Sequence, residues 1–190
     1  MELLEKIKAV EIAFENLDKE IAAFQSWSEL GCRIGCGKCC FKSDIEATIL
    51  EFLPFAQHLY ERNEAFSWLE KLETIDTPLC SILDPRQGGV GLCSEYRHRG
   101  LICRLFGFSA RTNKYSKKEL VTCQVIKEDQ AASYELAVEK IEGGKEVPVL
   151  SQHYMRLHAI DFELTHEFLP INQAIKKAIE VILHYHAYRS

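Results

Sequence analysis

Long apolar runs and a strong excess of charge are both missing from this sequence. No hydrophobic stretch approaches the ~20 residues that a membrane-spanning helix needs. The formal net charge of the 190 residues is only -5, which gives no overall attraction to nucleic acid or to an anionic membrane surface. We therefore expect neither a membrane nor a nucleic acid among the partners of this protein.

An export signal is missing as well. A secretory signal has a basic start followed by an uninterrupted apolar stretch, whereas Met1–Lys6 carries glutamates and mixes apolar with charged residues. We therefore expect a cytoplasmic location, where thiols stay reduced. A phosphate-binding loop is also absent, because Gly88–Gly91 leads into a cysteine turn and not into a helix that begins with Lys-Ser or Lys-Thr.

Cysteine, in contrast, is abundant. An even number of cysteines in a short secreted chain would indicate disulfides. A reducing compartment and a chain of 190 residues favour metal ligation over disulfides or scattered core thiols. We therefore predict that up to eight thiolates bind metal: Cys32, Cys36, Cys39, Cys40, Cys80, Cys93, Cys103 and Cys123.

The segment from Cys32 to Cys40 holds four of these cysteines. Thiols two or three residues apart can converge on one ion when a tight turn folds them inward, and Gly35 and Gly37 permit the positive φ angles of such turns. Backbone N–H groups in such a turn can also point at sulfur. Adjacent side chains usually diverge, so Cys39 and its neighbour either serve different metals or one of them is not a direct ligand. Two tetrahedral sites, or one cluster with spare thiolates, both remain open.

Basic residues accompany the cysteines. No acid occurs between residues 31 and 42, and arginines gather near Cys93 and Cys103. A metal group with four thiolates is anionic, and a cation ~5 Å away contributes roughly 3 kcal/mol at an effective dielectric constant near ~20, before desolvation. Solvated surface charges are the alternative interpretation. We predict that four cations balance the charge of the bound group: Arg33, Lys38, Arg99 and Arg104.

The apolar pattern predicts a mainly α fold. We expect a single domain of packed helices over residues 1–190, with a metal-binding core at 32–123 and flanking helices at 1–30 and 129–188. The cysteine centre should be irregular and loop-rich, with a short β-hairpin. A first helix that packs on its own domain is favoured over a coiled-coil seam. Its predicted buried face has alternating spacings of four and three: Leu3, Ile7, Val10, Phe14, Leu17, Ile21 and Phe24.

Local signals place the helices that follow the cysteine loop. Ser43 and Glu46 have the spacing of a capping box, which predicts a helix from there to about Leu53. Pro54 should force a break or restart, because it lacks an N–H donor. The next helical stretch is expected in two pieces around Asn63.

Further along the chain, turn residues and possible caps mark the remaining elements. The turn residues 84–89 predict a loose hairpin between Leu79–Leu83 and Val90–Cys93. Residues 104–124 are expected to be irregular or weakly extended. Asp129 is expected to cap a helix that ends near Gly143.

Two segments carry a recognisable pattern. The first is Cys36-Gly37-Lys38-Cys39-Cys40, preceded by Cys32, and the second runs from Cys93 to Phe106 and ends in Cys-Arg-x-Phe. They resemble the bacterial YkgJ-like cysteine-cluster family, which is named for its CxxCxxCC pattern and described as a zinc- or iron-chelating domain. The resemblance covers about residues 32–123 and implies that the cysteines, Cys80 and Cys123 included, chelate metal.

The chain departs from the family pattern in two places. Three residues, not two, separate Cys32 from Cys36, and Gly100 stands where the family usually has proline. Flagellin lysine methylases are similar in carrying such a cluster, and iron–sulfur binding is the role implied there. The cluster alone does not imply methyl transfer.

These observations favour a metal-binding cysteine-cluster protein with a structural, electron-transfer or redox-sensing role. As cofactor we favour an iron–sulfur cluster, [4Fe–4S], over Zn²⁺, because all-cysteine sites with loose spacing suit a cluster and because of the family resemblance. The partners we expect are the metal ion or cluster itself and a protein that exchanges electrons or metal with it.

An enzyme and a metal-delivery or partner-binding protein are the alternatives. The C-x3-C-x2-C spacing from Cys32 matches the radical S-adenosylmethionine motif, but the chain lacks the strand–helix repeats of a barrel. A metal-dependent hydrolase would use His98, His153 or His158 beside an open zinc position. The delivery protein would use its helical ends, although we expect ordinary surface or capping roles for the histidines there: His166, His184 and His186.

Overall fold

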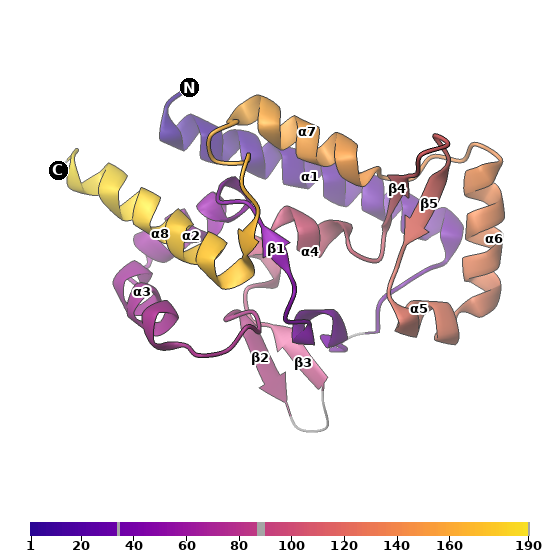
Figure 1. Ribbon diagram of the computed structural model, residues 1–190, viewed down its shortest axis with the longest axis horizontal. Helices are drawn as coiled ribbons and strands as arrows, with labels where there is room; N and C mark the ends of the chain where they lie inside the picture. The colour runs from indigo at the N-terminus through magenta and orange to yellow at the C-terminus, as the bar shows by residue number, and fades with distance from the viewer. Residues whose placement is uncertain (34, 87–89, 190) are drawn as a thin grey trace. The chain divides into compact units, whose positions relative to one another are not determined.

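The computed structural model describes residues 1–33, 35–86 and 90–189, and it is 58% helical with only small sheets (Figure 1). The mainly α fold predicted from the sequence is therefore confirmed. Its α-helices are α1 (Leu3–Ser28), α2 (Leu53–Glu61), α3 (Ala65–Thr74), α4 (Leu101–Leu105), α5 (Gln124–Asp129), α6 (Ala131–Glu142), α7 (Leu150–Ile160) and α8 (Ile171–Ala187). Short 3-10 helices are η1 (Lys38–Phe41), η2 (Leu50–Phe52) and η3 (Tyr96–His98).

The strands of the described residues form antiparallel pairs. These are β1 (Glu46–Ala47) with β6 (Leu169–Pro170), β2 (Leu83–Arg86) with β3 (Val90–Cys93), and β4 (Ser109–Thr112) with β5 (Lys118–Val121). The pair β2–β3 confirms that a hairpin ends at Cys93, which lies opposite Leu83, but its first strand is Leu83–Arg86 and not Leu79–Leu83, because residues 84–86 of the predicted turn extend the ladder. Residues 87–89 of its predicted turn lie outside the described residues. The pair β4–β5 gives regular structure to a segment for which the sequence indicated at most weakly extended chain.

The chain divides into two compact units. Unit 1 comprises Met1–Glu11, Gly35–Gly100 and Leu157–Ser190, and unit 2 comprises Ile12–Ile34 and Leu101–Arg156. Helices α1 and α7 contribute residues to both. The prediction of one single domain stays a prediction.

Unit 1 is built on α2, α3 and α8, which pack against one another (Figure 1). Phe55 and Leu59 of α2 are buried in this layer, and the Phe55 ring meets Trp68 of α3 edge-on, with the ring centroids 5.2 Å apart. Each fully buried large apolar side chain contributes about 1.5–3 kcal/mol, so this layer is the main source of stability in unit 1. The buried residues of α8 recur at helical spacing: Ile171, Ala174, Ile175, Ala178, Ile179 and Ile182.

The segment before α2 differs from its prediction. Ser43 and Glu46 do not begin a helix, because Glu46 lies in β1 opposite Pro170. The N–H of Ile171 donates to the carbonyl of Ile45 at 2.9 Å, which extends this contact to the start of α8. The predicted capping box is therefore wrong, because pairing with a segment far away in the sequence overrides the local signal.

A capping interaction of the same type forms a few residues later. The N–H and the hydroxyl of Thr48 both donate to the carboxylate of Glu51, at 2.8 and 3.1 Å, which is half of a Thr-x-x-Glu box. Helix α2 then begins with Pro54 in its first turn, where the missing N–H costs nothing. The predicted restart at this proline is confirmed, and so is the interruption at Asn63, which has a φ of 58°.

Unit 2 has its own apolar core, to which α1, α5, α6 and the β4–β5 hairpin contribute. Phe24 and Trp27 of α1 meet edge-on there, with ring centroids 5.1 Å apart. The face predicted for α1 is buried at every position from Ile7 to Phe24. The buried members of the unit 2 core are Phe24, Leu30, Ala110, Ile126, Ala137, Ile141 and Val147.

The helical part after β5 also corrects one prediction. Asp129 does not cap a helix but ends α5, which begins after Cys123. The Cys123 sulfur accepts a hydrogen bond from the N–H of Ile126 at 3.4 Å and so acts as the N-cap. Helix α6 follows and stops at Gly143, with Gly144 at a φ of 95°. The predicted glycine stop is confirmed.

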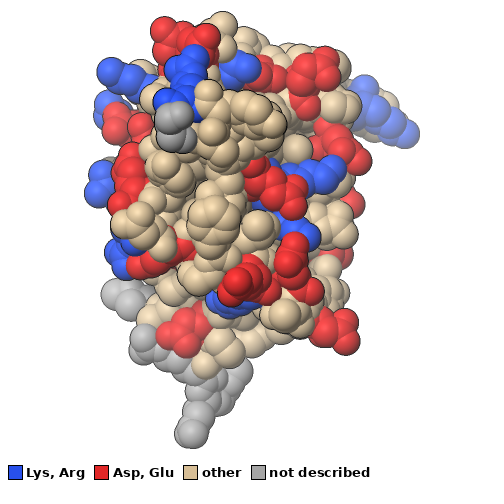
Figure 2. Space-filling model, turned by 90° about the vertical axis from the view of Figure 1, so that its left-hand side faces the viewer, with Lys and Arg blue, Asp and Glu red and all other residues tan. Residues whose placement is uncertain are grey.

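The helices of the described residues include none with the length and apolar character of a membrane span. Figure 2 shows acidic and basic side chains interspersed on the face that it draws. Among the ion pairs of unit 1, Lys176 of α8 lies 3.1 Å from Glu73 of α3 and 3.9 Å from Glu180. Such partly exposed pairs contribute little to stability.

Asn172 of α8 fixes the segment that precedes the β2–β3 hairpin. Its Oδ1 accepts a hydrogen bond from the N–H of Ser81 at 2.8 Å. Its Nδ2 donates to the carbonyl of Leu79 at 2.8 Å and to that of Thr77 at 3.3 Å. The segment that holds Cys80 is therefore tied to the three-helix layer of unit 1.

We predict that Asn172→Ala lowers the free energy of unfolding by roughly 1–3 kcal/mol, because each hydrogen bond contributes about 1 kcal/mol net. Denaturant titration measures the change. Gln173→Ala removes an exposed side chain of the same helix and should change stability by at most about 0.5 kcal/mol. Equal stabilities of the two variants would contradict the positioning role of Asn172.

Candidate metal centre

The cysteine loop turns at its two glycines. Gly35 has a φ of 72° and Gly37 a φ of 55°, the positive angles that the sequence predicts for this turn. Helix η1 begins directly after Gly37, and the N–H of Cys40 donates to the carbonyl of Gly37 at 2.8 Å. The turn therefore lies between Cys36 on one side and Cys39 and Cys40 on the other.

This loop lies in backbone contact with strand β3. A Cβ on Gly37 would be 2.2 Å from the carbonyl oxygen of Gly91, so no side chain fits at residue 37. Gly91 is less strictly confined, because a Cβ there would press on the side chains of Leu83, at 2.7 Å, and Phe41, at 3.1 Å. The contact places the cysteine loop beside the strand that ends at Cys93.

Unit 1 holds five of the eight predicted ligands: Cys36, Cys39, Cys40, Cys80 and Cys93. The sulfurs of Cys39 and Cys40 are 4.0 Å apart, so these adjacent side chains converge. Cys93 lies within electrostatic reach of Cys39 and of Cys80. In the described ranges, the one group of three or more possible ligands whose atoms all lie within 4.8 Å of one another contains no cysteine. Cys39, Cys40, Cys80 and Cys93 are thus neighbours in unit 1 without forming a closed ligand shell.

Cys39 differs from an ordinary thiol in its acidity. The hydrogen bond with the Cys40 thiol lowers the pKa of Cys39 to about 6, with help from backbone N–H groups and from the charge of Arg99, while partial burial opposes the shift. The Arg99 guanidinium lies over the Tyr96 ring at 3.5 Å, and its Nε donates to the Tyr96 carbonyl at 3.0 Å. At neutral pH Cys39 is therefore mostly a thiolate, the form that binds metal.

Cys80 and Cys93 show the opposite behaviour. Burial raises the pKa of Cys80 to about 11, and it also raises the pKa of Cys93. The charges of Lys71 and Arg99 oppose these shifts only weakly. A bound metal ion would supply the missing positive charge and displace both protons. One preformed thiolate with neighbouring thiols that a metal can deprotonate fits thiolate-bound zinc as well as an iron–sulfur cluster.

The other three predicted ligands lie in unit 2. Cys32 is exposed and follows α1, and Cys103 is half-buried in α4. Cys123 is the N-cap of α5 and packs against the unit 2 core. The structure thus gives Cys123 a local role, and metal ligation by these three cysteines stays a prediction.

Two of the four predicted cations lie in unit 1. Arg99 lowers the pKa of Cys39 and acts in the same direction on Cys93. Lys38 is exposed in η1, directly before Cys39. Their placement is compatible with the predicted charge balance, which itself stays a prediction.

The other two predicted cations lie in unit 2 and have acidic partners there. Nε of Arg33 is 2.5 Å from Oδ2 of Asp129. Nη1 of Arg104 is 2.5 Å from Oδ2 of Asp18, and only 7% of the Arg104 side chain is exposed. Its guanidinium also lies 4.7 Å from the centre of the Phe14 ring. Within unit 2, these arginines therefore take part in structural ion pairs.

The histidines of α7 make local polar contacts. Nε2 of His153 is 3.1 Å from the Glu20 carboxylate, to which Arg156 also donates at 2.8 Å. Burial lowers the pKa of His153, so its imidazole is neutral at neutral pH. Nδ1 of His158 is 2.7 Å from the Thr165 hydroxyl.

The C-terminal histidines have separate surroundings. His166 contacts the carbonyl of Glu163 at 2.9 Å. His186 stacks on Tyr60, with ring centroids 3.8 Å apart, whereas His184 is exposed. No metal-ligand group of the described residues includes them.

His98 lies beside His58 and Glu95. No sequence motif predicted that these three residues come together. Burial is the main cause of its lowered pKa, and the charge of His58 acts in the same direction, while Glu95 opposes them. His58 lies in α2, far from His98 in the sequence, and Asn172 lies further still from the cysteine that it positions. Neither His58 nor Asn172 belongs to a sequence motif. Only the fold brings His58 to His98 and Asn172 to the segment that holds Cys80.

We predict that Gly37→Ala destabilises the protein by more than roughly 1–3 kcal/mol, the usual cost of a strained backbone, because the new Cβ would also clash with Gly91. Denaturant titration and metal analysis measure the effect, and bound metal should fall as well. Gly31→Ala is the matched control, because nothing lies within 4 Å of a Cβ there. Equal stability and metal content in both variants would refute the close contact with β3.

We also predict that alkylation of Cys39 by iodoacetamide in metal-free protein rises with pH through a midpoint of about 6. Peptide mapping by mass spectrometry follows the reaction. Cys40→Ala should raise the midpoint more than Arg99→Gln, because the hydrogen bond is the larger cause of the shift. A wild-type midpoint at the ordinary thiol value, about 8.5, would show that Cys39 is not activated.

Comparison with known families agrees with this geometry. Residues 31–125, half of the chain, match the family model CxxCxxCC, and the match includes all eight cysteines. No curated protein and no solved structure matches the chain at a significant level. The chain therefore belongs to the CxxCxxCC family, a putative zinc- or iron-chelating domain.

Proposed function

We propose that unit 1 binds a [4Fe–4S] cluster through cysteine thiolates, with a structural, electron-transfer or redox-sensing role. The observation that carries this proposal is the backbone contact between Gly37 and Gly91, which places the cysteine loop on strand β3. The five thiols of unit 1 then come from four parts of the chain: residue 36, residues 39–40, residue 80 and residue 93. A cubane needs four thiolates, one for each iron, and these four parts can supply one each.

The electrostatics of unit 1 support an anionic metal group. Arg99 is held in place by Tyr96 and acts on both Cys39 and Cys93. Cys80 and Cys93 are too buried to ionise readily by themselves. A metal group beside them would remove this obstacle, since a thiol that coordinates a metal is deprotonated outright.

A structural role is supported by how little else holds the cysteine loop. Helix η1 has no buried residue, so hydrophobic burial contributes little to the fold of this segment. Metal binding is coupled to folding in such sites. We therefore expect the loop to depend on the bound group for much of its order.

Zinc is the second candidate, and one distance favours it. Two thiolates on one tetrahedral zinc ion, with Zn–S bonds of about 2.3 Å, lie ~3.8 Å apart. The sulfurs of Cys39 and Cys40 are 4.0 Å apart, so one ion could bind both. In a cubane, by contrast, each thiolate binds a different iron, and only one of these two cysteines would be needed.

The remaining predictions extend this proposal. Cys32, Cys103 and Cys123 stay candidate ligands, and Arg33, Lys38 and Arg104 stay candidates for charge balance together with Arg99. We place the protein in the cytoplasm, with a redox or metal-delivery protein as its partner. The reducing conditions there would keep the thiols available to metal.

The proposal predicts that anaerobically purified protein is brown and contains iron and acid-labile sulfide. Cys36→Ser and Cys93→Ser should each weaken metal binding by at least ~10-fold, because loss of a ligand exceeds the usual cost of losing a supporting residue. Metal analysis and visible spectra measure the change. Ser81→Ala is the control, because it alters a buried side chain next to Cys80 whose hydroxyl has no hydrogen-bond partner.

Variants of the adjacent cysteines separate the two cofactors. If the cofactor is a cubane, one of the two variants Cys39→Ser and Cys40→Ser should retain most of the metal, because only one of these cysteines is a ligand. If the cofactor is zinc, both variants should lose metal. If the purified protein is colourless and contains stoichiometric zinc, the cofactor is zinc and not an iron–sulfur cluster. Unchanged metal content in both Cys36→Ser and Cys93→Ser would contradict a thiolate centre in unit 1.

A further inference from the structure

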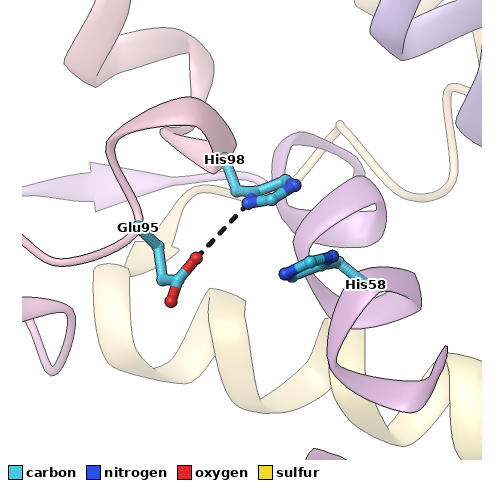
Figure 3. Close-up of side chains that lie close together, drawn as sticks. All are labelled: His58, Glu95 and His98. Atoms are coloured by element: carbon cyan, nitrogen blue, oxygen red, sulfur yellow. Dashed lines mark ion pairs between the residues drawn. The ribbon is translucent and has the colours of Figure 1, made fainter. Parts of the chain in front are cut away.

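Unit 1 contains a second cluster of potential ligands, made of nitrogen and oxygen atoms instead of sulfur. His58 projects from α2, Glu95 precedes η3, and His98 ends η3. Their ligand atoms all lie within 4.8 Å of one another, the single such group found in residues 1–33, 35–86 and 90–189. Figure 3 shows the three side chains directed toward one another from these two elements.

The contacts within this group leave a buried nitrogen without a hydrogen bond. Nδ1 of His98 is 3.4 Å from Oε2 of Glu95 (Figure 3), which is longer than an ordinary N–H···O bond. This nitrogen is inaccessible to solvent and has no hydrogen-bond partner. A buried polar atom in that state normally costs ~1–3 kcal/mol, so its persistence calls for an explanation.

The surrounding side chains hold the two rings in place. The rings of His58 and His98 stack, with centroids 4.2 Å apart and planes inclined by 23°. The Phe55 ring lies 6.0 Å from that of His98 and is itself packed edge-on against Trp68. All three potential ligands are half-buried, so the group is neither a solvated surface pair nor part of the apolar core.

The distances suit a single ion. Two ligands at about 2.0–2.1 Å from a tetrahedral zinc ion lie ~3.4 Å apart, which is the separation of Nδ1 of His98 and Oε2 of Glu95. A nitrogen of His58 lies within 4.8 Å of one ligand atom on each of the other two residues, so His58 needs to approach by little more than ~1 Å to complete the set. An imidazole binds a metal in the plane of its ring, so the His58 ring would also have to turn out of its stack on His98. A change of side-chain rotamer gives such a movement, whereas the backbone can stay as it is.

From this arrangement we propose that His58, Glu95 and His98 form a second metal site, which binds a divalent transition-metal ion such as zinc. Two imidazoles and a carboxylate are the donor set of three-ligand zinc sites, in which the fourth position stays open to water or another ligand. The same donors also suit ferrous iron, whereas thiolates favour softer ions and clusters. The site is separate in its ligands from the thiolate centre proposed above, and it does not depend on that centre being correct.

A structural contact between Glu95 and His98 is the competing explanation. An i,i+3 pair of this kind stabilises a helix by only about 0.2–0.5 kcal/mol, and here its distance of 3.4 Å exceeds a normal hydrogen bond. It also gives no reason for a second imidazole at the same place. Metal binding accounts for all three residues and for the unpartnered nitrogen.

Cobalt substitution tests this site in the whole chain of 190 residues. Co²⁺ bound to nitrogen and oxygen gives weak visible d–d bands without the ultraviolet charge-transfer band of a cobalt–thiolate bond. We expect wild type to bind one equivalent with this signature. Glu95→Gln and His58→Phe, which keeps the ring stack on His98, should weaken that equivalent at least ~10-fold and leave any thiolate band unchanged. His184→Gln, which alters an exposed histidine of α8, should bind like wild type.

The outcomes separate this site from the thiolate centre. Loss of the nitrogen–oxygen signature alone in Glu95→Gln and His58→Phe would support the site whether or not the thiolate centre exists. Equal cobalt binding in these variants, wild type and the control would overturn it. Should either variant fail to fold by circular dichroism, zinc titration of wild type followed by imidazole NMR decides. Shifts of the His58 and His98 ring signals would support the site, and unchanged signals would refute it.

Discussion

The close contact between two backbones, that of Gly37 and that of Gly91, is the constraint on which the proposed centre depends. It requires glycine at residue 37, because a Cβ there would collide with the backbone of Gly91, whereas a Cβ on Gly91 would press on the side chains of Leu83 and Phe41. It also requires the turn with positive φ at Gly37, which an ordinary residue adopts only at a cost. Strand β3 is in turn held by its pairing with β2, and the segment before β2 is held by Asn172 of α8. The cysteines of unit 1 are thus positioned by a chain of contacts that ends in the three-helix layer.

Within that frame, chemically identical side chains have different properties. Cys39 lies on an exposed loop, where the Cys40 thiol, backbone N–H groups and Arg99 stabilise its thiolate. Cys80 and Cys93 lie where burial favours the neutral thiol. A cation bound near Cys39 would reverse the preference of the other two. This difference fits an order of events in which the exposed thiolate binds first and the buried thiols lose their protons to the metal afterwards.

The sequence allowed prediction of those features that depend on local chemistry. The apolar face of α1, the turn at Gly35 and Gly37, the β2–β3 hairpin and the restart at Pro54 follow from periodicity, glycine and proline, and all are confirmed. The family assignment rested on cysteine spacing and is also confirmed.

Other features escaped prediction because they depend on contacts between distant residues. The capping signal at Ser43 failed because β1 pairs with β6, more than a hundred residues later. Asp129 failed as a cap because Cys123 already starts the preceding helix. Asn172 and His58 lie in no recognisable sequence motif. Asn172 contacts the segment that holds Cys80, and His58 contacts His98, only because the fold brings these residues together. The ion pair of Arg104 with Asp18 likewise had no local signal, and the assignment of Arg104 to charge balance stays a prediction.

X-ray absorption spectroscopy of anaerobically purified protein, at the iron and zinc edges, tests the central claim most directly. A thiolate centre predicts that the bound metal has a shell of about four sulfur neighbours near ~2.3 Å, the distance of a metal–thiolate bond. A sample in which iron and zinc have only nitrogen and oxygen neighbours, or in which neither metal is bound, would contradict a thiolate centre in this protein.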